Sequence, residues 1–224
     1  MPKLLDLYSG AGGAAVGYYR AGFTDITGVD NRPQKNYPYK FVQADALEYI
    51  AKHGHEFDLI HASPPCQVHS VTASLSRITH LDLVPQTRAA LIATGKPYII
   101  ENVPGAPLIN PLMLCGTMFG LGVIRHRLFE CSPVVWFPPS NCKHEGTCEP
   151  MFWADKKRST KFHKFVIVAG KNFKKRTAEI AMQIDWMICA ELSQAIPPAY
   201  TFWLGIEMLR LLSPPSGLAA QRTP

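Results

Sequence analysis

The strongest constraint on the fold is a glycine-rich loop that follows an apolar segment near the N-terminus. Residues 3–8 predict a short buried strand, the loop runs from Ser9 to Gly13, and a helix-forming segment continues to Arg20. Glycines let the chain turn sharply and let a ligand approach the backbone N–H groups that open a helix. A strand, a glycine loop and a helix in this order predict the first unit of an α/β fold with a ligand site at its turn.

Strands and helices then alternate along the chain. Further strands are expected at 26–30, 41–43, 57–61 and 97–101, with helices at 46–52 and 84–94 between them. This alternation predicts an α/β protein with a doubly wound, mainly parallel sheet, because parallel strands need crossover connections. Ligands bind such sheets at the carboxyl ends of the strands, and each motif described below lies at one of those ends.

The composition of the 224-residue chain changes after about residue 132. We expect residues 1–132 and 180–212 to form the main domain, residues 133–179 a small inserted region, and residues 213–224 a disordered tail. From 156 to 176 the inserted region carries nine Lys and Arg and no acid. Much of the basic excess behind the net charge of +6 therefore lies in one stretch, which favours a nucleic-acid partner.

The overall composition indicates where such a protein works. The six cysteines are scattered through a chain large enough to form its own core, which favours a reducing cytoplasm over a disulfide scaffold. The apolar runs fall short of the ~20 residues that a membrane span needs. The first residues also lack the layout of a signal peptide. We therefore expect a cytoplasmic monomer that acts away from membranes.

Two acids follow strands close to the glycine loop. Asp30 ends the second strand, about 20 residues after the loop, where an acid can bind the hydroxyls of a ribose. Asp45 follows the third strand, and it can contact an adenine or cap the next helix. From these residues alone, NAD and S-adenosylmethionine fit equally well.

A cysteine lies on a loop that two prolines stiffen. Cys66 follows Pro64 and Pro65 past the end of the fourth strand, and Gln67 comes next. Prolines fix the path of the chain, so this loop can hold a thiol in place, and a deprotonated thiol is a strong nucleophile. The alternative is a buried cysteine without a chemical role, which the loop context disfavours.

Five short motifs follow one another along the chain. They are Asp6-Leu-Tyr-Ser-Gly-Ala-Gly-Gly13, Ser63-Pro-Pro-Cys-Gln67, Glu101-Asn-Val103, Arg125-His-Arg127-Leu-Phe-Glu130 and Gln194-Ala-Ile-Pro-Pro198. In this order they resemble the motifs of DNA cytosine-5 methyltransferases of the small bacterial or phage type. Each motif is short, but their ordered combination is specific.

This resemblance implies methyl transfer from S-adenosylmethionine to C5 of a cytosine in double-stranded DNA. Cys66 would add to C6 of the base, and Glu101 would supply a proton or hydrogen bond to N3. Arg127 would contact the target base or its phosphate, with Arg125 in support. Because a stacked base cannot reach a recessed thiol, the cytosine is expected to flip out of the duplex.

The resemblance also implies the remaining contacts. On the cofactor side, Tyr8 and Asp45 would contact the adenine, and Asp30 would bind the ribose. Gly10 and Gly12 would hold the methionine end, and Pro65 and Gln194 would lie near the cofactor. On the substrate side it assigns Gln67 and Asn102, together with Lys156, Lys157 and Arg158 of the inserted region, whose charges can neutralise phosphates.

Three positions depart from the family's pattern. Val123 stands where Gln is usual before the paired arginines, His69 near the position of a Phe in the nucleophile loop, and Gln194 where Asn is usual. These changes leave a different specificity or an unusual electrophile open, and they remove no residue that the chemistry requires.

Cysteines and a histidine around the start of the inserted region raise the question of a metal. Cys131, Cys142, His144 and Cys148 lie within 18 residues and could form a Cys3His zinc site. Their spacing lacks the paired Cys-x-x-Cys knuckle of common zinc sites, so we predict no metal.

Other functions compete with the leading one. The same chemistry on RNA, such as a tRNA, would use the same motifs and the same basic region. A catalytically silent DNA-binding relative would keep the fold, although the presence of Cys66 and Glu101 opposes it. An NAD oxidoreductase explains the glycine loop and Asp30 but gives the cysteine loop no role. Restriction partnering, phage self-protection and regulation are all compatible with the sequence.

Overall fold

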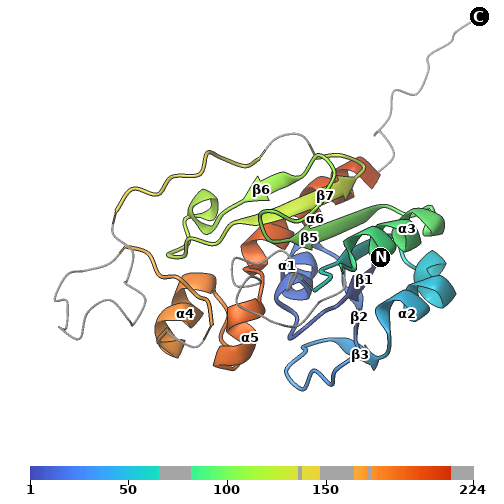
Figure 1. Cartoon of the computed structure of the whole chain (residues 1–224), viewed down its shortest axis with the longest axis horizontal. Helices are drawn as coiled ribbons and strands as arrows, with labels where there is room; N and C mark the ends of the chain where they lie inside the picture. The colour runs from blue at the N-terminus through green and yellow to red at the C-terminus, as the bar shows by residue number, and fades with distance from the viewer. Residues whose placement is uncertain (66–81, 136–137, 147–163, 171–172, 213–224) are drawn as a thin grey trace, which may run out of the picture.

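The computed structural model describes residues 1–65, 82–135, 138–146, 164–170 and 173–212. At its centre is a seven-stranded sheet in the order β3-β2-β1-β4-β5-β7-β6 (Figure 1). The strands are β1 (Lys3–Leu7), β2 (Asp25–Asp30), β3 (Lys40–Gln43), β4 (Leu59–Ala62), β5 (Tyr98–Asn102), β6 (Leu112–Leu114) and β7 (Arg127–Ser132). The first five pair in parallel, and β7 pairs antiparallel with both of its neighbours. The expected mainly parallel sheet is confirmed.

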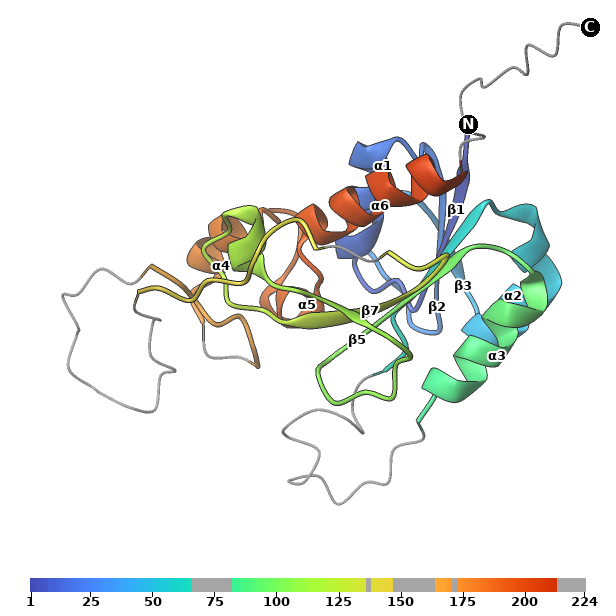
Figure 2. The ribbon, with the colours of Figure 1, turned by 90° about the horizontal axis from the view of Figure 1, so that it is seen from above.

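Helices cover both faces of this sheet. They are α1 (Gly13–Ala21), α2 (Ala46–His53), α3 (Val84–Thr94), α4 (Lys175–Met182), α5 (Cys189–Gln194) and α6 (Pro198–Leu212), with short 3-10 helices η1 (Gly54–Glu56) and η3 (Gly116–Phe119). Figure 2 shows α1 and α6 on one side of the sheet and α2 and α3 on the other. The sheet is therefore doubly wound, as expected. No helix in the described ranges is long and apolar enough to cross a membrane.

The alternation of side chains along β1 builds two apolar clusters, one on each face. Leu4 belongs to the cluster that includes α1 and α6, whereas Leu5 and Leu7 belong to the cluster that includes α2 and α3. All three leucines are fully buried, as expected for a central strand covered on both sides. Val166 and Val168, from the expected insertion, pack into the first cluster.

The carboxyl end of the sheet is where the chain order reverses. β1 has β2 on one side and β4 on the other, so the loops after β1 and β4 leave the sheet in opposite directions. Because β7 runs antiparallel to β5, with Asn102 opposite Leu128, its first residue lies at the same edge as the end of β5. The motifs from β1, β2, β4, β5 and β7 therefore converge.

The segment between Ile180 and Leu192 contains parts of two helices, because α4 ends at Met182 and α5 begins at Cys189. Gln183 adopts a left-handed conformation with φ 57°, which stops α4. The backbone N–H of Ile188 then donates to Glu191 Oε2 over 2.9 Å and starts a new helix. The strand β6 was not predicted, because three residues give too short a pattern.

The contact between α1 and α6 depends on a glycine. A Cβ at Gly17 would collide with the Pro198 carbonyl and the Thr201 hydroxyl, and it would lie 2.7 Å from the backbone nitrogen of Phe202. Most of these atoms belong to the backbone of α6, so they cannot rotate away. The absence of a side chain at this position lets the two helices approach closely.

We therefore expect Gly17→Ala to lower the free energy of unfolding by about 1–3 kcal/mol or more through overpacking. Urea unfolding followed by circular dichroism measures the change. Gly122→Ala is the matched control, since a Cβ there would lie at ordinary distances of 3.6 Å from the Ala181 side chain and 3.8 Å from the Lys164 carbonyl. Equal stability of the two variants would contradict the close packing of α1 on α6.

Candidate active site

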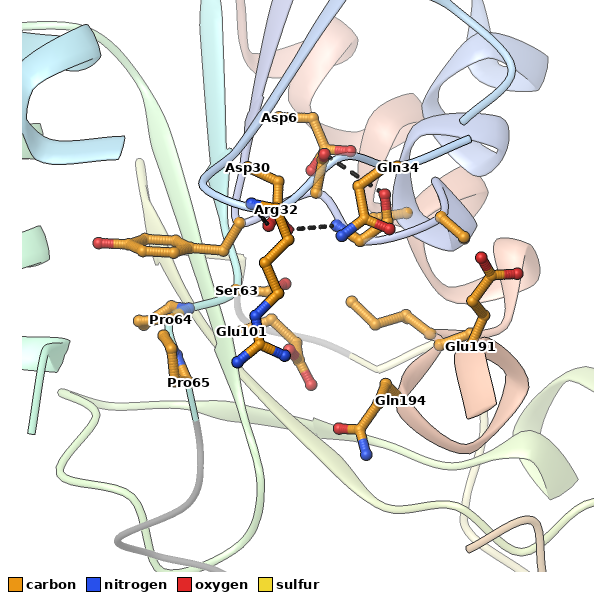
Figure 3. Close-up of a pocket in the computed structure, with 18 of the residues that line it drawn as sticks. Asp6, Asp30, Arg32, Gln34, Ser63, Pro64, Pro65, Glu101, Glu191 and Gln194 are labelled. Carbon is orange, nitrogen blue, oxygen red and sulfur yellow. Dashed lines mark hydrogen bonds between the residues drawn. The ribbon is translucent and has the colours of Figure 1, made fainter. Parts of the chain in front are cut away.

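A cavity of ≈ 830 Å³ opens at the carboxyl ends of the strands. Its walls come from the loops after β1, β2, β4 and β5, from the start of β7 and from α5 (Figure 3). Among the residues assigned from the sequence, it is lined by Tyr8, Gly10, Asp30, Asp45, Pro65, Glu101, Arg127 and Gln194. The structure thus brings together side chains that lie almost 190 residues apart in the chain.

Hydrogen bonds fix the glycine loop on one side of this cavity. The backbone N–H of Gly10 donates to Asp30 Oδ2 over 3.1 Å, and the indole of Trp186 donates to the Ala11 carbonyl over 2.9 Å. Gly12 does not line the cavity but forms the turn before α1, with φ 83°. A Cβ there would also lie 2.7 Å from Pro38, so both conformation and space require glycine.

Two assigned residues also have structural roles. Asp45 caps α2 by accepting from the backbone N–H groups of Leu47 (2.8 Å) and Glu48 (3.0 Å). The capping interpretation of Asp45 is therefore confirmed, although the residue also borders the cavity. Tyr8 has a positive φ of 56°, which is strained for a side chain of this size, and its hydroxyl lies 3.0 Å from Thr87 Oγ1.

Glu101 is the acid among the residues assigned to catalysis. Its side chain is buried at the end of β5, and burial raises the pKa of its carboxyl above the ordinary value. Arg127, whose Nε lies 2.9 Å from Glu101 Oε1, and a hydrogen bond with Ser63 oppose this shift but do not cancel it. A carboxyl in such a place can stay protonated at a higher pH than an exposed one.

A hydrogen-bonded chain in the core continues behind Glu101. The hydroxyl of Ser63 lies 3.0 Å from Nε2 of His61, and Nδ1 of the same ring lies 3.0 Å from the hydroxyl of Tyr18. Burial lowers the pKa of His61 to about 3, so the imidazole is neutral. A neutral ring between two hydroxyls orients Ser63, and Ser63 in turn orients Glu101.

Arg125 and Asn102 lie behind the cavity rather than in its wall. The Arg125 guanidinium donates to the carbonyls of Val168 (2.6 Å) and Ser193 (2.8 Å). The Asn102 amide donates to the Pro64 carbonyl over 3.1 Å. Arg125 thereby ties the strand of Arg127 to two distant segments, and Asn102 fixes the start of the Pro64-Pro65 loop.

Several assigned residues lie outside the described ranges. They are Cys66, Gln67, His69, Cys148, Lys156, Lys157 and Arg158, together with the tail 213–224. The first described range ends at Pro65, which borders the cavity next to Pro64 (Figure 3). Val123, one of the departures from the family pattern, is fully buried in the apolar cluster with α1 and α6.

Comparisons with known proteins fit this arrangement. Residues 2–106 match the family described as C-5 cytosine-specific DNA methylase. The chain is also 37% identical over 82 residues to the Type II methyltransferase M.FnuDI of Fusobacterium nucleatum. Residues 2–106 of the chain are therefore similar to the cytosine-5 methyltransferase family. The match to M.FnuDI covers 34% of this chain and only 24% of the relative's length.

A solved structure supports the fold. The Dnmt2 methyltransferase of S. pombe superposes with a TM-score of 0.61 and 13% identity, covering 94% of this chain and 99% of that one. At this identity the likeness concerns the fold alone. The cofactor of cytosine-5 methyltransferases is S-adenosylmethionine, which favours it over NAD, the other cofactor that the glycine loop allowed.

Other residues that line the cavity were not found from the sequence. Asp6 lines the cavity although it is 1% exposed, and burial raises its pKa well above the ordinary value; the hydroxyl of Tyr37 donates to it over 3.2 Å. Arg32 points into the cavity (Figure 3), and Glu191 borders it while accepting two hydrogen bonds from Asn36. An acid inside an apolar strand was the available signal for Asp6.

Proposed function

We propose that this protein transfers a methyl group from S-adenosylmethionine to C5 of cytosine in double-stranded DNA. The observation that carries the proposal is the buried Glu101, positioned by Arg127 and Ser63, beside the Pro64-Pro65 loop that leads to Cys66. The match of residues 2–106 to the family described as C-5 cytosine-specific DNA methylase supports the same reaction.

The residues that line the cavity support S-adenosylmethionine as the cofactor. S-adenosylmethionine supplies an electrophilic methyl group on a sulfonium, and it carries a ribose and an adenine. Asp30, at the end of β2, would accept hydrogen bonds from the ribose hydroxyls, as acids do at this place in related folds. Gly10 would let the methionine end approach the backbone. Tyr8, Asp45, Pro65 and Gln194 border the remaining space and would contact the adenine and its surroundings.

The chemistry begins with the addition of the Cys66 thiolate to C6 of the cytosine. The electron pair of the C5–C6 double bond makes C5 nucleophilic, while a protonated Glu101 donates a hydrogen bond or a proton to N3. C5 takes the methyl group as its bond to sulfur breaks. A base then removes the C5 proton, the C5–C6 double bond forms again, and the Cys66–C6 bond breaks with its electron pair returning to sulfur. Any proton given to N3 returns to Glu101.

Arg127 lies in the wall of the same cavity and would bind the target base or its phosphate while keeping Glu101 in place. The cytosine would enter by flipping out of the duplex, since a stacked base cannot reach this recess. Gln67 would belong to the loop around it, and Lys156, Lys157 and Arg158 would neutralise backbone phosphates.

Cys66→Ala should lower methyl transfer on the order of 10³-fold or more, because alanine has no thiolate that can add to C6. The experiment measures transfer of labelled methyl from S-adenosylmethionine to duplex DNA and, in parallel, to tRNA. Cys189→Ala, at an exposed cysteine of α5, should keep full activity.

The two substrates separate the competing functions. Transfer to duplex DNA alone supports the proposal, and transfer to tRNA alone supports the RNA enzyme. Unchanged activity of Cys66→Ala would contradict the covalent mechanism. A wild-type protein that binds DNA but transfers nothing to either substrate would be the silent relative.

Glu101→Gln should slow transfer by about 10²–10⁴-fold, since an amide donates a hydrogen bond but no proton. It should also change the pH profile. In the wild type, activity falls as pH rises through the raised pKa of Glu101, because the deprotonated carboxylate cannot donate. The variant lacks this fall, whereas Glu48→Gln, at an exposed acid on α2, keeps it. A pH profile of the rate that is identical in wild type and Glu101→Gln would rule out this role.

A further inference from the structure

Four metal-binding side chains meet outside the cavity. They are Cys115, His126, Cys142 and His144, and their ligand atoms all lie within 4.8 Å of one another. Cys115 lies between β6 and η3, His126 directly precedes β7, and the other two belong to the segment 138–146. Three separate parts of the chain therefore supply one cluster.

We propose that these four residues form a structural zinc site. With zinc–sulfur bonds of about 2.3 Å and zinc–nitrogen bonds of about 2.0–2.1 Å, a tetrahedral site separates sulfur from nitrogen by roughly 3.5 Å. Nε2 of His144 lies 3.4 Å from the Cys115 sulfur and 2.9 Å from the Cys142 sulfur, and Nε2 of His126 lies 3.5 Å from the Cys142 sulfur. The ligand atoms need only small shifts to surround an ion.

The ligand set selects the metal. Two thiolates and two imidazoles suit zinc, whereas magnesium and calcium prefer oxygen ligands. Four protein ligands fill a tetrahedral site and leave no position for water or substrate, so the ion is structural rather than catalytic.

Neighbouring groups support the two sulfur ligands. The hydroxyl of Thr117 lies 3.5 Å from the Cys115 sulfur and 3.6 Å from the Cys142 sulfur, and the same hydroxyl oxygen accepts from the backbone N–H of Lys143. A backbone N–H of Arg125 also donates to the Cys115 sulfur. Donors that surround thiolates in this way orient the ligands of metal sites.

The segment 138–146 itself indicates what the ion does. It contains no helix or strand, and Cys142 is its one side chain that is not exposed. Ordering a stretch of chain has an entropic cost that exposed residues do not offset. Zinc bound through Cys142 and His144 would fix this segment against the strand that carries Arg127, because His126 immediately precedes that arginine.

This ligand set differs from the one that the sequence suggested. Cys131 lies in β7, is 8% exposed and has its sulfur 4.0 Å from the Phe129 carbonyl, and it is not part of the cluster. Cys148 lies outside the described ranges. Cys115 and His126 take their places, and both come from segments that precede the expected insertion.

The test is the zinc content of the full-length protein, measured by mass spectrometry after expression with added zinc and gel filtration in metal-free buffer. We expect about one zinc per chain. The double variant Cys142→Ser with His144→Ala should lose it, whereas Cys189→Ser, Cys131→Ser and Cys148→Ser should keep it. Cobalt loaded in place of zinc should give the strong visible absorption bands of a tetrahedral thiolate site in the wild type. The double variant should not show these bands.

Circular dichroism and binding of S-adenosylhomocysteine report whether the double variant stays folded, independently of the metal. Wild-type protein without zinc would overturn the proposal. So would zinc that persists in the folded double variant, zinc that is lost on removal of Cys148, or a disulfide between Cys115 and Cys142 in non-reducing mass analysis. None of these outcomes depends on methyl transfer, so the metal site and the proposed function fail separately.

Discussion

The ion pair between Glu101 and Arg127 joins the two parts of the chain on which the site depends. Glu101 is the penultimate residue of β5, in the part of the chain that matches the family, and Arg127 opens β7, which lies beyond that match. The pair forms because β7 runs antiparallel to β5 and brings its first residue to the carboxyl end of the sheet. Without that reversal, the acid and the arginine would lie at opposite edges.

Around this pair, burial and hydrogen bonding act in opposite directions on the same carboxyl. Burial raises the pKa of Glu101, while Arg127 and Ser63 lower it. Removing one partner of a buried ion pair lowers the stability of the fold by more than the pair itself contributes to it. Glu101, Arg127 and Ser63 therefore hold one another in place. The chain from Tyr18 through His61 to Ser63 anchors one side, and the zinc cluster that we propose would anchor the other through His126.

The features that were predicted from the sequence are those encoded by short local patterns of residues. The strands β1 to β5 followed from short apolar runs bounded by turns, and the glycine loop with Asp30 followed from their spacing, because these signals lie within a few residues. Asp6 was missed because its importance comes from burial, which depends on the strands packed around it. The pairing of Arg125 with the carbonyls of Val168 and Ser193 likewise depends on contacts across more than 40 residues.

The metal cluster also depends on contacts between residues that are far apart in the sequence, and the sequence did not predict it. A search for cysteines within a short stretch of sequence selected Cys131 as a metal ligand, although its side chain is buried in the apolar core. The same search missed Cys115 and His126. These two residues reach Cys142 only through the folding of β6, η3 and β7 around one another. Ligand spacing identifies a site when one loop supplies the ligands, and it fails when three segments do.

The most direct test of the account is covalent trapping on a fluorinated substrate. Duplex DNA of random sequence is made with 5-fluorocytosine throughout, so that any recognition site is presented, and is mixed with protein and S-adenosylmethionine. Fluorine at C5 cannot leave as a proton does, so the enzyme stays bonded to C6. We predict a stable adduct whose peptide map places the nucleotide on Cys66. An adduct on another residue, or none from a preparation that methylates ordinary cytosine, would contradict the account.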